Sequence, residues 1–574
     1  MHRTTSRTPS RWRGALAVAV AGALMTSASC SSADDAGPAA GEEAEASDPA
    51  VGEEGEAPAV CDQEPTVDPV VAVPVAGAPS DVAVTSFDGT SIRAHWFPVG
   101  AAPPGVPAPT VLMGPGWGAP GATPEATSAG PPAAMTVGRL NAAGYNVLTW
   151  DPRGFGRSGG TVTVNDPEHE GRDVQVLLDW VAARPEAALD RAGDPRAGMV
   201  GGSYGGGIQL TVASLDCRVD ALVPTMAWHS LETSLYRNET LKAGWLGLLG
   251  ASSGPATDPH LARALRSGLE GQMSPGAVDW LHDRGPGDAV ARITAPTLLV
   301  AGSVDTLFTP TEAFANFEAL RDAGTTVAMA WYCGGHGVCL TGQGDPALMG
   351  DRTMAWLDRH LRGGASDTGP VVDVIDQQGQ RWIGDDLPDD VDQLEAHSEG
   401  GILALDATSV AGPVAPVAGT DVLTAMAASL SPARADRAVE VTATSDAETL
   451  VLGAPQVTMT YRGTSPDGTE PTRVFAQVVD DATGVVLGNQ ITPVPVTLDG
   501  TEHRVEVDLE VVAHHLAPRS RVTLQIVATT PGYATPRLGG TVTISELTLA
   551  LPTTAALERP PTLRPAGSPT TSTP

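Results

Sequence analysis

Three residues of this 574-residue sequence have the types and the chain order of a nucleophile, an acid and a base. Ser203 lies in the run GGSYGG at residues 201–206, and Asp305 and His336 follow it in that order. A serine hydroxyl attacks a carbonyl efficiently only when a base takes its proton and a carboxylate orients that base. We therefore expect Ser203, Asp305 and His336 to form a catalytic triad.

The pattern Gly-x-Ser-x-Gly does not identify the nucleophile by itself, because it occurs around Ser158, Ser203 and Ser252. The chemistry needs a strand that ends at the serine and a helix that begins directly after it. Ser252 lacks a preceding strand-like run, and Ser158 lies eight residues beyond its run. Ser203 has the strand-like residues 197–200 before it and the helix-compatible residues 208–215 after it.

The acid and the base are assigned by their place after apolar runs. Asp305 comes shortly after residues 296–301, and His336 shortly after residues 327–332. Glycines on both sides of His336 allow its loop to bring the imidazole over the serine. The competing residues fit other roles better: a pocket or structural role for His229, a surface or interface position for His514 and His515, and support of the loop beside the serine for Asp151.

The elements around these residues predict an α/β-hydrolase fold. Continuous apolar runs alternate with helical patterns, which indicates a parallel sheet covered on both faces. In this fold the triad follows the chain order serine, acid, histidine. Residues 228–293 interrupt the alternation with helical stretches and are predicted to form an inserted cap. The expected strands are residues 82–87, 91–97, 110–113, 145–150, 197–200, 219–223, 296–301 and 326–331.

Past residue 363, strand-like runs separated by turn residues predict an all-β sandwich or jelly roll. The runs are residues 371–375, 438–444, 456–461, 474–479, 503–509, 521–528 and 541–551.

The oxyanion of a tetrahedral intermediate needs two preorganised donors. The backbone N–H of Tyr204, the residue after the nucleophile, is expected to be one. The loop after residues 110–113 supplies the other, and we favour the N–H of Trp117 over those of its neighbours Gly116 and Gly118.

The N-terminus has the composition of an export signal. Arginines precede a short apolar stretch at residues 14–25, which is too short to span a bilayer stably. Residues 26–30 (TSASC) resemble a bacterial lipoprotein cleavage box, although Ser27 stands where leucine is preferred. Lipidation of Cys30, and so a place on the outer face of the bacterial membrane, is favoured over plain secretion.

The domain boundaries follow from these patterns and from composition. We expect a signal peptide at residues 1–30, an acidic disordered linker at 31–75, an α/β-hydrolase domain at 76–364, a β-sandwich jelly-roll domain at 365–555 and a disordered tail at 556–574.

The cysteines fit an oxidising compartment. Cys333 and Cys339 flank His336 closely and are our first candidates for a disulfide, which leaves Cys61 with Cys217. A zinc site needs more ligands at close spacing than this segment offers, so no metal and no cofactor are expected. The formal net charge of −33 repels nucleic acid, which favours a small-molecule or peptide substrate. The oligomeric state is left open.

These motifs resemble the X-Pro dipeptidyl-peptidase and cocaine esterase family (peptidase family S15). The resemblance covers residues 81 to 552 and rests on GGSYGG, the cap before the acid, the β domain, and residues 376–382 and 514–518 within it. It implies the same triad and a β domain that helps to shape the site. One departure is the oxyanion loop, where some esterases of the family use a tyrosine hydroxyl and this loop offers Trp117.

Two classes of function remain open at this point. The leading prediction is a hydrolase of esters or amides, in which an X-Pro peptidase would need a carboxylate such as Glu232 or Glu239 to hold the substrate ammonium. The alternative is a catalytically inert cell-surface protein that binds its partner through the jelly roll.

Overall fold

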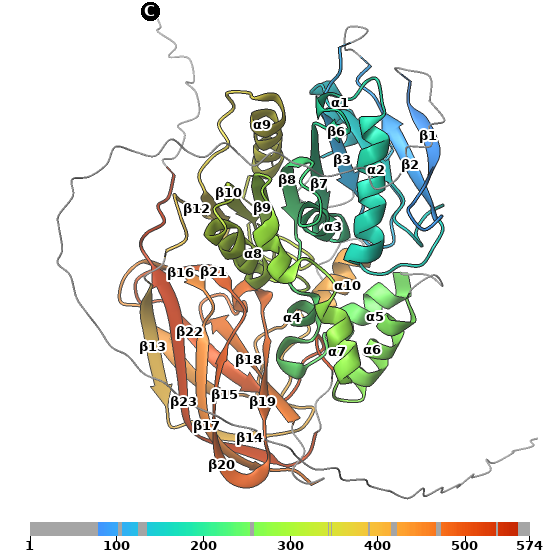
Figure 1. Ribbon diagram of the computed structural model, residues 1–574. Helices are drawn as coiled ribbons and strands as arrows, with labels where there is room; N and C mark the ends of the chain where they lie inside the picture. The colour runs from blue at the N-terminus through green and yellow to red at the C-terminus, as the bar shows by residue number, and fades with distance from the viewer. Residues whose placement is uncertain are drawn as a thin grey trace, which may run out of the picture. The chain divides into compact units, whose positions relative to one another are not determined.

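A ten-stranded sheet runs through the part of the chain in which strands and helices were expected to alternate (Figure 1). Its order is β1-β2-β4-β3-β7-β8-β9-β10-β11-β12, and the strands from β4 to β11 are parallel. The strands are β1 Ser80–Thr85, β2 Ser91–Phe97, β3 Thr110–Gly114, β4 Asn146–Trp150, β7 Ala197–Gly202, β8 Val219–Thr225, β9 Thr297–Gly302, β10 Val327–Tyr332, β11 Val372–Ile375 and β12 Arg381–Gly384. A short hairpin, β5 Leu189–Arg191 and β6 Asp194–Pro195, lies outside this sheet.

The computed structural model describes residues 78–100, 106–123, 135–252, 258–342, 344–345, 347–388, 391–414, 422–466, 472–534 and 538–560. All of these described residues belong to one compact unit. The expected signal peptide, the acidic linker, Cys30 and Cys61 therefore lie outside the described residues. No helix in the described part of the chain has the length and apolar character needed to cross a bilayer.

Both faces of the sheet are covered, which explains why its central strands are apolar throughout. Successive residues of β3 enter different cores, Val111 on one face and Leu112 on the other. Helices α2, α3 and α8 contribute to the core with Leu112, and α1 and α9 to the core with Val111. The helices are α1 Val137–Ala142, α2 Arg172–Ala182, α3 Tyr204–Ala213, α8 Pro310–Asp322 and α9 Leu348–Arg362.

The region expected to be a cap, residues 228–293, holds helices and no strand among its described residues. Its apolar side chains share a core with Tyr204, Leu307 and Phe308, next to the carboxyl edge of the sheet. The helices are α4 Leu231–Leu235, η2 Arg237–Glu239, α5 Ala243–Ser252, α6 Pro259–Leu269, α7 Pro275–His282 and η3 Gly287–Arg292.

Among the described residues after β12, the only helices are α10 (Val422–Leu430) and the short η4 (Leu487–Asn489), and strands make up the rest of the regular structure, as the strand-like runs predicted (Figure 1). A seven-stranded and a four-stranded sheet share one core. The jelly-roll order itself stays a prediction. The strands are β13 Asp392–Ser398, β14 Gly401–Ala404, β15 Val439–Thr444, β16 Thr449–Gly453, β17 Gln456–Thr464, β18 Thr472–Asp480, β19 Thr492–Val496, β20 Asp499–Asp508, β21 Val512–Leu516, β22 Arg521–Val527 and β23 Thr541–Thr554.

Two boundaries differ from the expected ones. The first domain was expected to end at residue 364, but β11 and β12 extend its sheet to Gly384, with Val372 paired to Met329 of β10. A short apolar strand looks the same in either sheet, so the sequence pattern could not assign it. The tail was expected to begin at residue 556, yet Leu557 is buried and Glu558 pairs with Ile383.

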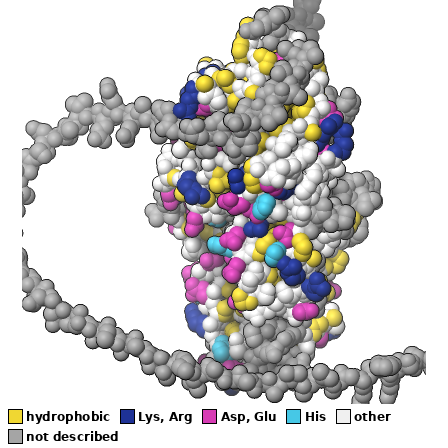
Figure 2. All heavy atoms as spheres, turned by 45° about the vertical axis from the view of Figure 1, so that its right-hand side comes forward, with side chains coloured by type: hydrophobic (Ala, Val, Ile, Leu, Met, Phe, Trp, Pro, Cys, Tyr) yellow, Lys and Arg dark blue, Asp and Glu magenta, His cyan; other side chains and the backbone are white. Residues whose placement is uncertain are grey.

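The surface carries mixed charge. On the face in Figure 2, basic side chains occur in small groups next to acidic ones, and histidines lie among them. A field that could attract a polyanion requires basic side chains gathered on one face. The face in this view carries no such gathering among its described residues.

Asp220 of β8 offers a pH-dependent test of the fold. Burial raises the pKa of its carboxyl to about 7, although the hydrogen bond that the carboxyl accepts from the Ala197 N–H (2.8 Å) lowers this pKa. The folded state therefore holds a proton that the unfolded chain releases near pH 4, so stability falls as the pH rises toward about 7. Asp220→Asn should raise the Tm at pH 8 by about 2–4 °C, and thermal melts at pH 5 should show a smaller difference. An equal difference at both pH values would contradict this.

Candidate active site

Ser203 sits on the sharp turn between β7 and α3 that the sequence predicted. Its backbone has φ 58° and ψ −117°, a strained conformation that costs on the order of 1–3 kcal/mol. The surroundings hold it there, because the Ser203 N–H donates to the Thr225 carbonyl at 2.8 Å and its carbonyl accepts from the N–H groups of Gly206 and Gly207. The strain exposes the hydroxyl at the carboxyl edge of the sheet.

The glycine at position 205 lets the first turn of α3 lie directly on β3. A Cβ at this position would lie 2.2 Å from the Gly114 carbonyl oxygen. Any side chain would therefore push the helix away from the strand and move Ser203 with it.

Asp305 and His336 meet Ser203 at the same edge. The Ser203 Oγ lies 2.9 Å from the His336 Nε2, and the His336 Nδ1 lies 2.7 Å from the Asp305 Oδ2. Asp305 is fully buried. Gly335, with φ +127°, lets the histidine loop approach, since a Cβ there would lie 2.5 Å from the Asp305 Cβ.

The carboxylate of Asp305 accepts four hydrogen bonds. Its Oδ1 accepts from the N–H groups of Leu307 and Phe308, and its Oδ2 from the N–H and the Nδ1–H of His336. The proton of the imidazole is thereby fixed on Nδ1, which leaves the Nε2 lone pair for the serine hydroxyl. This arrangement can take the proton of Ser203 as the hydroxyl attacks a carbonyl.

The two residues expected to supply the oxyanion donors, Tyr204 and Trp117, line the same pocket as Ser203. Tyr204 is the first residue of α3, so its N–H has no acceptor within the helix. The Trp117 ring meets the rings of Tyr204 and Phe155 edge-on, each at 5.2 Å. The Trp117 indole N–H donates to the Leu249 carbonyl of α5 (3.0 Å), so the oxyanion loop is tied to the cap.

Tyr204 is itself held by two residues that the sequence did not reveal. Its hydroxyl donates to Glu170 (2.9 Å), and the Asn165 amide donates to the Tyr204 carbonyl (2.8 Å). Glu170 lies in η1 (Pro167–Gly171), and burial raises its pKa although several donors stabilise the carboxylate. Neither residue belongs to a motif, so no sequence signal pointed to this clamp.

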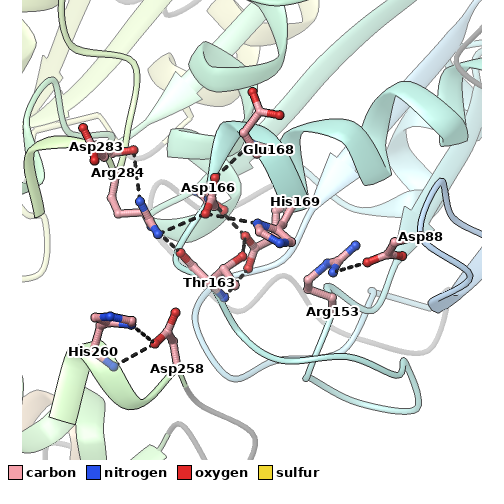
Figure 3. Close-up of polar contacts among 12 residues, drawn as sticks. Asp88, Arg153, Thr163, Asp166, Glu168, His169, Asp258, His260, Asp283 and Arg284 are labelled. Atoms are coloured by element: carbon pink, nitrogen blue, oxygen red, sulfur yellow. Dashed lines mark hydrogen bonds and ion pairs between the residues drawn. The ribbon is translucent and has the colours of Figure 1, made fainter. Parts of the chain in front are cut away.

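The same segment anchors the cap (Figure 3). The Arg284 guanidinium of the cap donates to the Thr163 carbonyl at 2.9 Å and lies 3.0 Å from the Asp166 carboxylate. The Asp258 N–H donates to the Val162 carbonyl at 3.0 Å. Cap and core are thus linked within three residues of Asn165.

An apolar pocket of about 420 Å³, which includes space open to solvent, lies next to the serine. No charged residue lines it among the described residues. Glu232 contacts His282 at 3.3 Å on the surface instead, and neither Glu232 nor Glu239 lines the pocket. The lining residues are Trp117, Val164, Ser203, Tyr204, Trp228, Leu231, Leu235, Leu246, Leu249, Leu261, Leu307 and Phe308.

The competing candidates have other contacts. The Ser158 hydroxyl donates to the Asp151 carbonyl at 2.6 Å, and the Asp151 carboxylate accepts the N–H groups of Gly121 and Arg157. His229 contacts Asn316 at 3.0 Å. Ser252 is the last residue of α5.

In the β domain, His514 is buried against Asp480 and His515 contacts Glu448. The predicted disulfide between Cys333 and Cys339 is present. Cys217 is disulfide-bonded as well, whereas its expected partner Cys61 lies outside the described residues.

Part of the chain matches a known protein family. Residues 88–337 match the family model of the X-Pro dipeptidyl-peptidases (S15 family). An uncharacterized 31.7 kDa Escherichia coli protein from the traX-finO intergenic region is 30% identical over 109 residues, 19% of this chain and 36% of that protein. The match thus spans about a third of that relative's length.

Solved structures share the fold. An α-amino acid ester hydrolase has a TM-score of 0.61 at 14% identity, over 86% of this chain and 100% of its own. An aminopeptidase from the marine sediment archaeon Thaumarchaeota archaeon has a TM-score of 0.60 at 14% identity, with the same coverage of both chains. A CocE/NonD family hydrolase from Staphylococcus aureus has a TM-score of 0.58 at 15% identity, over 82% of this chain and 93% of its own.

Proposed function

Because residues 88–337 of this chain belong to the X-Pro dipeptidyl-peptidase (S15) family, we propose that the protein is a serine hydrolase whose triad is Ser203, His336 and Asp305. The observation that carries the proposal is the position of the imidazole, 2.9 Å from the serine hydroxyl and 2.7 Å from the buried carboxylate.

In the proposed mechanism His336 takes the proton of Ser203 through Nε2 as Oγ attacks the carbonyl carbon of an ester or amide. The N–H groups of Tyr204 and Trp117 stabilise the oxyanion that forms. The imidazolium, stabilised by Asp305, then gives its proton to the leaving alcohol or amine. Water, activated by the same imidazole, releases the acid from the acyl-enzyme.

Labelling with a fluorophosphonate tests the nucleophile. The wild-type protein should become phosphonylated on Ser203, and Ser203→Ala should not be labelled. Ser158→Ala is a matched control, since it removes the serine of another Gly-x-Ser-x-Gly and should retain labelling. An unlabelled wild type, or equal labelling of Ser203→Ala, would refute the proposal.

We also propose that the apolar pocket accepts the acyl group. It is lined by Ser203 and by the oxyanion residues Tyr204 and Trp117, whereas His336, which protonates the leaving group, is not part of its lining. A pocket of leucines and aromatic rings favours an uncharged acyl group, and an X-Pro peptide would bring an ammonium that finds no carboxylate there.

The pocket lining predicts that the enzyme prefers an uncharged acyl group, and a comparison of two esters with the same leaving group measures this preference. The kcat/KM for 4-nitrophenyl butyrate should exceed that for 4-nitrophenyl 4-aminobutyrate by about 10²-fold or more, since burial of the ammonium costs several kcal/mol. An X-Pro anilide should be a poorer substrate than either ester. Preference for the charged ester or for the anilide would assign peptidase activity instead.

The proposal includes export. We propose that the N-terminal signal directs the protein to the cell surface and that Cys30 carries a lipid. Metabolic labelling with a fatty acid analogue should mark the wild-type protein and not Cys30→Ser. The scattered basic side chains on the face in Figure 2 and the net charge of −33 support a small-molecule substrate over nucleic acid.

The alternative is an inert binding protein that uses the C-terminal sheets, which we propose to be a jelly roll. Two features favour the enzyme, because an inert core needs neither. One is the strained turn at Ser203, and the other is the set of hydrogen bonds that joins His336 to Ser203 and Asp305. The fluorophosphonate experiment separates the two.

A further inference from the structure

Side chains from outside the α/β sheet hold the loop that follows Asp305, here called the acid loop (residues 305–311). Gln490 of the β domain donates to the Asp305 carbonyl at 2.7 Å. Lys242 of the cap donates to the Leu307 carbonyl at 3.0 Å. Glu510, also of the β domain, accepts hydrogen bonds from the hydroxyls of Thr309 and Thr311, both at 2.7 Å.

Glu510 is buried between positive charges. Its exposed fraction is 2%, and the Arg237 guanidinium of η2 lies 3.6 Å from it. Burial raises the pKa of this carboxyl, but Arg237, Lys242 and the threonine hydroxyls together lower it below its usual value. Burial lowers the pKa of Lys242, and the charge of Glu510 opposes this. Glu510 is thus an anion that compensates two cations of the cap, the buried Lys242 and the partly exposed Arg237.

The acid loop also contacts the imidazole of His336 and forms part of the pocket wall. The Phe308 ring meets the His336 ring at 90° with centroids 5.2 Å apart, and Leu307 and Phe308 line the apolar pocket. The N–H groups of these two residues hold the Asp305 Oδ1. A displacement of Thr309 therefore moves the orientation of the imidazole and the wall of the pocket together.

We propose that Glu510 is a positioning residue, through which the β domain fixes the acid loop and completes the active site. The inference rests on the proposed function for the role of Asp305. According to this proposal the hydrolase needs its β domain for activity. The positive charges of Arg237 and Lys242 in the cap hold Glu510 in position.

The test uses the full chain and the variant Glu510→Gln, which keeps the shape of the side chain and removes its charge. The rate of fluorophosphonate labelling and kcat for 4-nitrophenyl butyrate should fall by about 10–100-fold, because small displacements of a triad cost this much. KM should rise by about threefold to tenfold as well, since Leu307 and Phe308 of the same loop line the pocket. Asp480→Asn is the matched control: it removes a buried β-domain carboxylate that pairs with His514 at 3.3 Å, and it should label at the wild-type rate.

Thr309→Val provides a second variant if Glu510→Gln does not fold. It removes the hydroxyl that donates to Glu510 from the acid loop, and it should slow labelling as well. The double variant should be no slower than Glu510→Gln alone, since both changes break one contact. Additive effects of the two changes would overturn the proposal.

Lys242 gives a readout that does not depend on catalysis. It is the only lysine of the chain and 2% exposed, so an amine-reactive reagent followed by peptide mass spectrometry reports its accessibility. Glu510→Gln should raise its acylation rate by about tenfold or more as the loop loosens. Folded Glu510→Gln with wild-type rates at both Ser203 and Lys242 would overturn the inference. If wild type itself is not labelled at Ser203, the proposed function fails, and the rate at Lys242 alone then decides whether Glu510 holds the loop.

Discussion

Asp305→Asn is expected to lower kcat by about 10³–10⁴-fold while the protein stays folded. The carboxylate accepts two hydrogen bonds on each oxygen, from Leu307 and Phe308 on one side and from His336 on the other. An amide has one oxygen, so its NH₂ group must face one pair of N–H donors. If it faces His336, the imidazole proton moves to Nε2, which can then no longer accept the proton of Ser203.

The measurement is kcat with 4-nitrophenyl butyrate, with circular dichroism to establish folding. Asp351→Asn is the control, because Asp351 is exposed and pairs with Arg139 at 2.8 Å on the surface; its kcat should stay within about twofold of wild type. A loss of less than about tenfold in Asp305→Asn would assign the orienting carboxylate to another residue.

The meeting of Ser203, Asp305 and His336 could be predicted because each of them lies at or shortly after the end of a parallel strand. The register brings these ends together: Gly202 of β7 pairs with Thr225 of β8, and Tyr332 of β10 pairs with Gly302 of β9. Three local patterns of strand followed by turn were therefore enough to expect Ser203, Asp305 and His336 at one edge. The same reasoning placed Trp117 beside Tyr204.

The residues that support the site could not be predicted in this way. Glu510 contacts Thr309 across 201 positions of sequence, and nothing in its neighbourhood distinguishes it from a surface glutamate. Its partner Lys242 is unusual only because it is the single lysine. Such contacts depend on how the β domain packs, which local periodicity does not contain.

The substrate specificity also could not be predicted from local sequence patterns. Their place in the cap makes Glu232 and Glu239 candidate partners for a substrate ammonium. The helical cap turns its leucines toward Ser203, and Glu232 contacts His282 on the surface. An amphipathic helix shows which face is apolar, but its sequence does not say whether that face meets a core or a substrate.

Arg218→Met is expected to produce a large loss of stability, about 3–5 kcal/mol in the free energy of unfolding. The Arg218 guanidinium is fully buried and lies 2.6 Å from the Asp179 carboxylate and 2.7 Å from the Asp216 carboxylate. It connects α2 with the turn before β8. Methionine fills much of the volume but leaves two buried carboxylates without their cation, and this uncompensated charge is the main cost.

Chemical denaturation followed by tryptophan fluorescence measures the effect. Arg504→Met is the matched control, because Arg504 is 61% exposed and pairs with Glu546 at 3.5 Å; its loss should stay below about 1 kcal/mol. The triple variant Arg218→Met, Asp179→Asn, Asp216→Asn removes all three charges and should recover part of the stability that Arg218→Met alone loses. If the triple variant were as unstable as the single one, the cost would lie in lost hydrogen bonds and packing, since no uncompensated charge would remain among these three residues.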